Sequence, residues 1–80
     1  MEVTIKFYYG FERYLRDNSN KALNLQLDSP ADILSIVNRF LPKEFIGYVG
    51  MVLVNKKIAN FDYQVKEGDM IEVFPVIGGG

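Results

Sequence analysis

The segment SPADILSIVNRFLP, residues 29–42, decides the fold, because its apolar residues follow the spacing of an α-helix. Ser29 suits the N-cap position, Pro30 suits the first helical position, and Asp32 in the first turn favours the positive end of the helix dipole. Pro42 ends the helix, because proline cannot continue the backbone hydrogen-bond ladder. The pattern predicts one helix with a broad stripe packed on a core. The stripe consists of Ile33, Leu34, Ile36, Val37, Phe40 and Leu41.

The segments on both sides of this helix have the pattern of β-strands. Residues 3–7 and residues 23–27 alternate between apolar and polar side chains, which predicts two half-buried strands before the helix. After the helix, residues 51–54 form a continuous apolar strand, a short strand surrounds Ile58, and residues 70–76 form the last strand.

The order strand, strand, helix, strand, strand, strand predicts an α+β fold with one main helix on a mixed sheet of four to five strands. We expect the first and last strands to lie parallel in the centre, which is the β-grasp, or ubiquitin-like, arrangement. Pro75 lies inside the last strand, so that end must be an edge or must be leaving the sheet. The strand residues expected to pack on the helix are Val3, Ile5, Phe7, Leu23, Leu25, Leu27, Ile71 and Val73.

The composition excludes several classes of function. Eighty residues suit a single domain over residues 1–80. The net charge is −1 and the basic residues are dispersed, so the concentrated positive surface that nucleic-acid binding needs is absent from the sequence. The chain has no Cys and no His, which removes thiolate nucleophiles, ordinary zinc sites and the commonest general base. We therefore expect no self-contained enzyme and no bound metal or cofactor.

The chain is also expected to be cytoplasmic. Its first residues, MEVTIKFYYGFERYL, lack the basic start and small-residue cleavage site of a signal peptide. Its apolar runs are too short to span a membrane.

The last strand leads into FPVIGGG, residues 74–80, and residues 78–80 are expected to form a flexible glycine tail. A glycine run adds nothing to a fold, so its use would lie in its freedom and its lack of side chains. Without Cβ atoms, Gly79 and Gly80 can enter a narrow channel in an extended form.

Over essentially its whole length, the chain resembles the β-grasp sulfur-carrier family, which includes the small subunit of molybdopterin synthase and the carriers of thiamine synthesis and tRNA thiolation. The stretch VTIKFYYGFERYL is similar to the family's first strand, and VLVNKKIANFDYQVKEGDMIEVFPVIGGG is similar to its Val-Asn turn, Gly-Asp turn and final strand. Molybdopterin members commonly end in Phe-Pro-Pro-Val, a small residue and Gly-Gly. Phe74 and Pro75 match that ending, Val76 replaces the second proline, and Gly79-Gly80 is the glycine pair.

The resemblance implies that the reactive group is the α-carboxylate of Gly80. A C-terminal carboxyl has a pKa of about 3.5 and is a poor electrophile when ionised, so it needs activation. The implied route is adenylation by a ubiquitin-activating-type enzyme that uses ATP and Mg, followed by conversion to a thiocarboxylate. The implied sulfur acceptor is the molybdopterin synthase large subunit or another sulfur-accepting enzyme.

A docking surface beside the tail is expected on the face of the sheet that points away from the helix. Because strand residues alternate between faces, Phe74 and Tyr8 should share that face and form an exposed apolar patch. The predicted binding residues are Tyr8, Phe74, Pro75, Gly78 and Gly79.

Other functions remain open at this point. The same activated terminus would serve a ubiquitin-like protein modifier joined through Gly80 to lysine side chains. The sulfur could also serve thiamine synthesis or tRNA thiolation. A further alternative is a β-grasp interaction module whose tail takes no part in its function.

Overall fold

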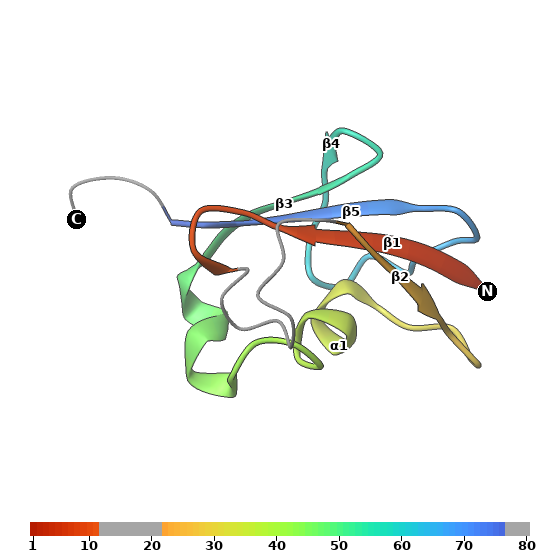
Figure 1. Cartoon of the computed structure of the whole chain (residues 1–80), viewed down its shortest axis with the longest axis horizontal. Coiled ribbons are helices and arrows are strands. Elements are labelled where there is room, and N and C mark those ends of the chain that lie inside the picture. Colours follow the sequence, from red (N-terminus) through yellow and green to blue (C-terminus); the bar gives the residue numbers. More distant parts are fainter. Residues whose placement is uncertain (12–21, 77–80) are drawn as a thin grey trace.

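The computed structural model describes residues 1–11 and 22–76. Within them, five strands form one sheet in the order β2-β1-β5-β3-β4 (Figure 1). The strands are β1 (Glu2–Phe7), β2 (Leu23–Gln26), β3 (Val49–Val54), β4 (Lys57–Ile58) and β5 (Met70–Pro75). The α-helix is α1 (Ile33–Val37), and a 3-10 helix, η2 (Lys43–Tyr48), precedes β3. The predicted α+β, β-grasp fold with a mixed sheet is confirmed.

The first and last strands lie side by side in the centre of the sheet, as predicted. β1 and β5 are parallel, with Ile5 opposite Ile71 and Phe7 opposite Val73. β2 pairs antiparallel with β1, and β3 pairs antiparallel with β5. Pro75 is the last residue of β5 and lies opposite Val49 of β3, beyond the last pair between β5 and β1. A proline is tolerated there because the pairing with β1 has already ended.

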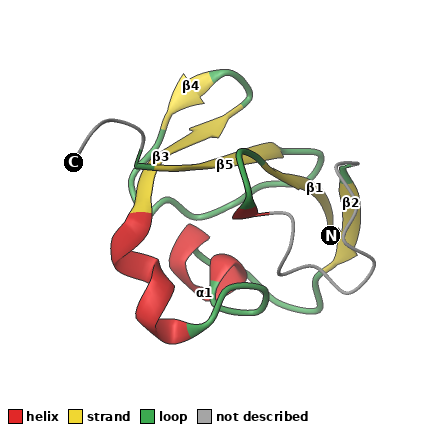
Figure 2. Cartoon of the chain, turned by 60° about the vertical axis from the view of Figure 1, so that its left-hand side comes forward, coloured by secondary structure: helices red, strands yellow, loops and turns green. Residues whose placement is uncertain are grey.

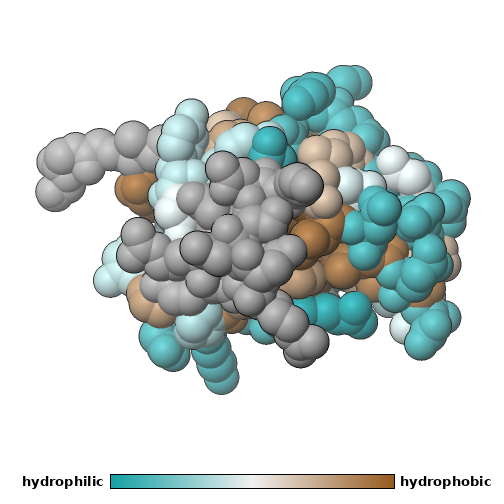
Figure 3. Space-filling view, viewed as in Figure 1, coloured by the Kyte–Doolittle hydropathy of each residue, from teal (hydrophilic) through white to brown (hydrophobic). Residues whose placement is uncertain are grey.

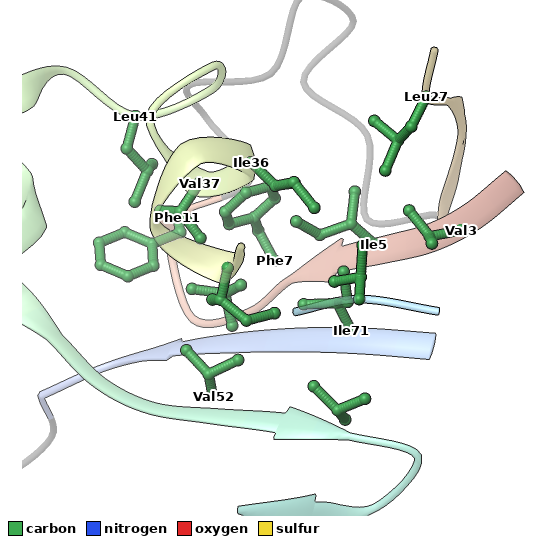
Figure 4. Close-up of a cluster of buried hydrophobic side chains, with 14 residues drawn as sticks. Val3, Ile5, Phe7, Phe11, Leu27, Ile36, Val37, Leu41, Val52 and Ile71 are labelled. Atoms are coloured by element: carbon green, nitrogen blue, oxygen red, sulfur yellow. The ribbon is translucent and has the colours of Figure 1, made fainter. Parts of the chain in front are cut away.

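The hydrophobic core lies between one face of the sheet and the helical segments (Figure 2). Ile5 and Ile71 point from the central strands toward Ile36 and Val37 of α1 (Figure 4). Six of the eight expected strand residues are buried: Val3, Ile5, Phe7, Leu27, Ile71 and Val73. Leu23 and Leu25 are only partly buried, because β2 is an edge strand with a neighbour on one side.

The predicted start of the helix is wrong. α1 begins at Ile33, and its N-cap is Asp32, whose carboxylate accepts a hydrogen bond of 2.8 Å from the backbone N–H of Ser35. Ser29 and Pro30 lie before the helix. The backbone ahead of α1 is extended because Asp32 forms an isolated β-bridge with Gln64. Pairing with a distant segment therefore overrides the local helix-start signal.

The apolar stripe of the helix is buried over most of its length. Ile33, Ile36, Val37 and Leu41 are buried. The predicted end of the helix at Pro42 is wrong, because α1 ends at Val37 with Asn38 as its C-cap. Turns with backbone hydrogen bonds, such as that from the Leu41 N–H to the Val37 carbonyl, carry the chain from there to Leu41. Leu34 was predicted to belong to the packed stripe, but 36% of its surface is exposed, so that part of the prediction is wrong.

The Leu34 position follows Ile33 by one residue, about 100° around the helix, and so lies at the margin of the packed face.

No helix in the described part of the chain is long and apolar enough to cross a membrane.

Candidate functional site

The candidate site surrounds the end of β5, where two aromatic rings meet on the face of the sheet opposite α1. The chain continues past β1 into Tyr8, whose N–H donates a hydrogen bond of 3.1 Å to the Val73 carbonyl. This hydrogen bond extends the β1–β5 pairing by one residue and places Tyr8 beside Phe74. The two rings stack, with centroids 4.4 Å apart and an interplanar angle of 8°. The structure therefore brings together two of the predicted binding residues.

A third aromatic ring joins this pair. Tyr9 has a φ of 54°, a left-handed conformation that turns the chain sharply after β1. Its ring lies 6.1 Å from that of Phe74, and 69% of its surface is exposed. Tyr9 was not among the predicted binding residues; the one local signal for it is Gly10, whose φ of 102° suits a turn directly after β1.

An open groove runs along these rings to the end of β5. We call it the β5 groove; it is lined by Tyr9, Gly50, Met51, Phe74, Pro75 and Val76. Met51 is 38% exposed and Val76 is 63% exposed. Exposed apolar side chains gathered in one place are typical of protein-binding surfaces. Pro75 is thus part of the same surface as Phe74.

The carboxylate of Glu72 is buried next to the stacked rings of Tyr8 and Phe74. Glu72 points to the same face as Phe74, yet only 3% of its surface is exposed. One of its oxygens accepts a hydrogen bond from the Tyr8 hydroxyl, and the other forms a salt bridge of 3.0 Å with the ammonium of Lys56. Lys6 also lies close, with its ammonium 4.9 Å from the centroid of the Tyr8 ring. Burial of a charge is tolerated here because it is both paired and hydrogen-bonded.

The contacts among Tyr8, Glu72 and Lys56 determine the protonation states of Glu72 and Tyr8. The hydrogen bond from the Tyr8 hydroxyl, together with Lys56, holds the pKa of Glu72 below its ordinary value of 4.5 despite burial. The same hydrogen bond and the neighbouring negative charge raise the pKa of Tyr8 to about 12. At neutral pH, Glu72 is therefore ionised and Tyr8 is a hydrogen-bond donor, which holds the Tyr8 ring in its place under Phe74.

Lys56 and Asp69 have larger structural roles than the sequence indicated. The turn between β3 and β4 contains Asn55 and Lys56 with φ of 52° and 72°, and it points the Lys56 side chain at Glu72. Asp69 is 5% exposed and accepts hydrogen bonds from the Asn55 amide, the Tyr63 hydroxyl and the Lys66 N–H. Burial opposes ionisation of Asp69, but these three donors outweigh it and lower its pKa. The two carboxylates therefore connect the β3–β4 turn to β5.

The β5 groove and the N-terminus lie toward opposite ends of β5. In Figure 3, many hydrophilic side chains are visible toward the end of the molecule that holds the N-terminus, with apolar side chains among them. The β5 groove lies at the other end, where the chain leaves the sheet. Three of the predicted site residues, Gly78, Gly79 and Gly80, lie outside the described residues.

The comparisons with known proteins agree with this architecture. Residues 42–80 match the model of the ThiS family. No curated protein matches the chain with significant similarity.

Among solved structures, SAMP1 from Haloferax volcanii is similar with a TM-score of 0.72 and 17% identity, over 100% of both chains. Urm1 from Trypanosoma brucei has a TM-score of 0.71 and 20% identity, over 99% of this chain and 95% of that chain.

A third similar structure is the complex of subunits 1 and 2 of molybdopterin-converting factor from Helicobacter pylori 26695, with a TM-score of 0.62, 20% identity and coverage of 100% of both chains. At these identities the likeness shows a shared fold. Together with the ThiS match over residues 42–80, it confirms the resemblance of this chain to the β-grasp sulfur-carrier family.

Proposed function

We propose that this chain is a sulfur carrier whose reactive group is the α-carboxylate of Gly80. The observation that carries the proposal is the position of the β5 groove. Its aromatic rings lie where β5 ends at Pro75, five residues before Gly80. A partner bound to this groove would hold the tail residues close to its own active site.

The proposed reaction has two steps. A carboxylate oxygen of Gly80 attacks the α-phosphorus of ATP on the adenylating partner, and pyrophosphate leaves. Hydrosulfide then attacks the acyl carbon. The bond from that carbon to the oxygen of AMP breaks, AMP leaves and one proton is released. The product is a thiocarboxylate at Gly80, and the chain acts as a carrier rather than as an enzyme.

The lack of cysteine in the sequence supports the placement of the sulfur on the C-terminal carboxyl group of Gly80. The sequence contains no Cys, so a persulfide cannot form on this chain. Ordering a glycine on binding costs about 1–2 kcal/mol, and the groove supplies apolar surface whose burial offsets that cost.

We propose molybdopterin synthesis as the pathway that receives the sulfur. The Phe74-Pro75 pair at the end of β5 supports this, as does the likeness of fold to the molybdopterin-converting factor complex of Helicobacter pylori. In that assignment the partners are an adenylating enzyme of the ubiquitin-activating type and the large subunit of molybdopterin synthase. Complementation of strains that lack the small carrier of molybdopterin, thiamine or tRNA-thiolation pathways tests this choice. Rescue of only the thiamine or tRNA strain would contradict it.

Mass measurement of the C-terminal peptide, from protein isolated from its own cells, tests the carrier function. The expected result is a population in which sulfur replaces one oxygen at Gly80. The control is the same protein produced in cells without the adenylating enzyme, in which the carboxylate form is expected. A protein modifier would instead show Gly80 in isopeptide bonds to lysines of other proteins. An unmodified carboxylate alone would contradict both functions.

A further inference from the structure

The base of the tail is held against β3 by its backbone. Val76, the residue after β5, donates a hydrogen bond of 2.7 Å from its N–H to the Tyr48 carbonyl, at the end of η2. The β3–β5 register shifts here: Val49 lies opposite Pro75 and Met51 lies opposite Phe74, so Gly50 is an extra residue in β3. An inserted residue of this kind bends a strand and changes its direction relative to its neighbour.

The position of Gly50 has no room for a side chain. A Cβ atom added there would lie 2.9 Å from the Val76 Cα, 3.0 Å from the Pro75 carbonyl oxygen and 3.0 Å from the Val76 nitrogen. All three are backbone atoms, so no rotation of a side chain could relieve the contact. The glycine therefore allows the backbone at residues 75 and 76 to lie directly against β3 at this bulge.

These contacts fix the direction in which the chain leaves the sheet. Val76 is held on one side by the Tyr48 carbonyl and lies against Gly50, while Phe74 is held by its stacking on Tyr8. Phe74 in β5 and Val76 directly after β5 are therefore both fixed at the point from which residues 77–80 continue the chain.

We propose that Gly50 is a positioning residue: it sets the exit direction of the tail and so the placement of the Gly80 carboxylate in the site of the adenylating partner. This inference rests on the proposed function. A reacting group displaced by about 1 Å can lose about 100-fold in rate. Because Gly50 acts on the path of the tail, it affects the rate of adenylation at saturating partner more than the affinity for that partner.

The test compares Gly50→Ala with Gly47→Ala. Gly47 lies three residues earlier on η2, and an added Cβ there meets nothing within 4 Å, so this variant is a matched control for the loss of one glycine. ATP–pyrophosphate exchange by the purified adenylating enzyme gives kcat and KM for each variant. Amide hydrogen exchange at Val76, Ile5 and Ile71 separates a local change at the tail base from general destabilisation.

We expect Gly47→Ala to behave as the wild type. In Gly50→Ala, exchange at Val76 should become faster while Ile5 and Ile71 stay protected. The value of kcat should fall by about tenfold or more, a larger factor than the change in KM that follows from the place of Gly50 in the lining of the β5 groove. A wild-type kcat in Gly50→Ala would overturn the inference. Failure of Gly50→Ala to fold would also overturn it, because the strain would then fall on the sheet rather than on residues 75 and 76.

The outcome for the wild-type protein separates this inference from the proposed function. If the wild-type chain supports no pyrophosphate exchange, the proposed function fails and the inference falls with it. If the wild type is active and Gly50→Ala is equally active, the inference alone fails.

Discussion

The rings of Tyr8 and Phe74 stack 4.4 Å apart, and the hydroxyl of Tyr8 donates to the buried carboxylate of Glu72. The Tyr8 side chain thus connects the partly exposed ring of Phe74 to a buried carboxylate on the same face of the sheet. Glu72 and Lys56 fix Tyr8 from below, and Tyr8 in turn supports Phe74 at the margin of the β5 groove. The groove therefore presents a preorganised ring, and a partner that binds it need not order Phe74.

Truncation of Phe74 tests the groove as a docking surface. Phe74→Ala should weaken binding to the adenylating enzyme by about 2 kcal/mol, or roughly thirtyfold in the dissociation constant, because central aromatic anchors commonly carry that much. The loss of the ring pair should cost only about 0.5–1.5 kcal/mol of stability. Isothermal titration and thermal unfolding measure the two effects.

The matched control is Ile58→Ala on β4, which removes an apolar side chain that is 77% exposed and lies outside the β5 groove. This variant should bind as the wild type. If Phe74→Ala keeps full affinity but melts early, Phe74 has a structural role and the docking surface lies elsewhere.

Truncation of Ile36 tests the packing of α1. Its side chain is fully buried against the sheet, so Ile36→Ala should destabilise the protein by about 2–5 kcal/mol. Chemical denaturation gives the free energy of unfolding. Leu34→Ala on the same helix is the control, because Leu34 is 36% exposed and should cost much less. Equal losses in both variants would contradict the orientation of α1.

Glu72 should make the free energy of unfolding depend on pH in the acidic range. Its pKa in the folded protein lies below its ordinary value of 4.5, chiefly because of the hydrogen bond from Tyr8. Its contribution is therefore fully present above pH 4.5 and is lost as the pH falls through the folded pKa. Glu72→Gln cannot ionise, so its unfolding free energy should fall less steeply below pH 4.5 than that of the wild type.

Denaturation curves between neutral and acidic pH measure this difference. Glu44→Gln removes an exposed carboxylate and serves as the control for the loss of one negative charge. An acid dependence in Glu72→Gln that equals the wild type would show that the Tyr8–Glu72–Lys56 network does not stabilise the fold.

The sheet and most of the core could be predicted from the sequence because they follow the period of two in residues 3–7 and 70–75. Val3, Ile5 and Phe7 of β1 and Ile71 and Val73 of β5 are buried in the core, and the parallel pairing follows from a single crossover through the helix. The first residue of α1 could not be found this way. Ser29 and Pro30 are a sound local start signal, but Asp32 pairs with Gln64, and no local pattern reveals a partner 32 positions away.

The site was only partly predictable. Alternation placed Tyr8 and Phe74 on one face, and the structure adds their stacking. The burial of Glu72 could not be predicted from the sequence, because alternation assigns a residue to a face of the sheet but does not say which side chains cover it. Lys56 reaches Glu72 only because two successive residues of its turn adopt positive φ. Tyr9, likewise, joins the groove through a turn whose geometry the sequence indicates only by Gly10.

We propose that the α-carboxylate of Gly80 is the group that the adenylating partner activates. The most direct measurement is ATP–pyrophosphate exchange by the adenylating enzyme with two forms of the chain, one ending in the Gly80 carboxylate and the other in the Gly80 carboxamide. The two forms have the same length and the same groove, so thermal unfolding and partner affinity should agree between them. We expect exchange with the carboxylate form and none with the carboxamide form. Equal exchange with both forms would contradict it.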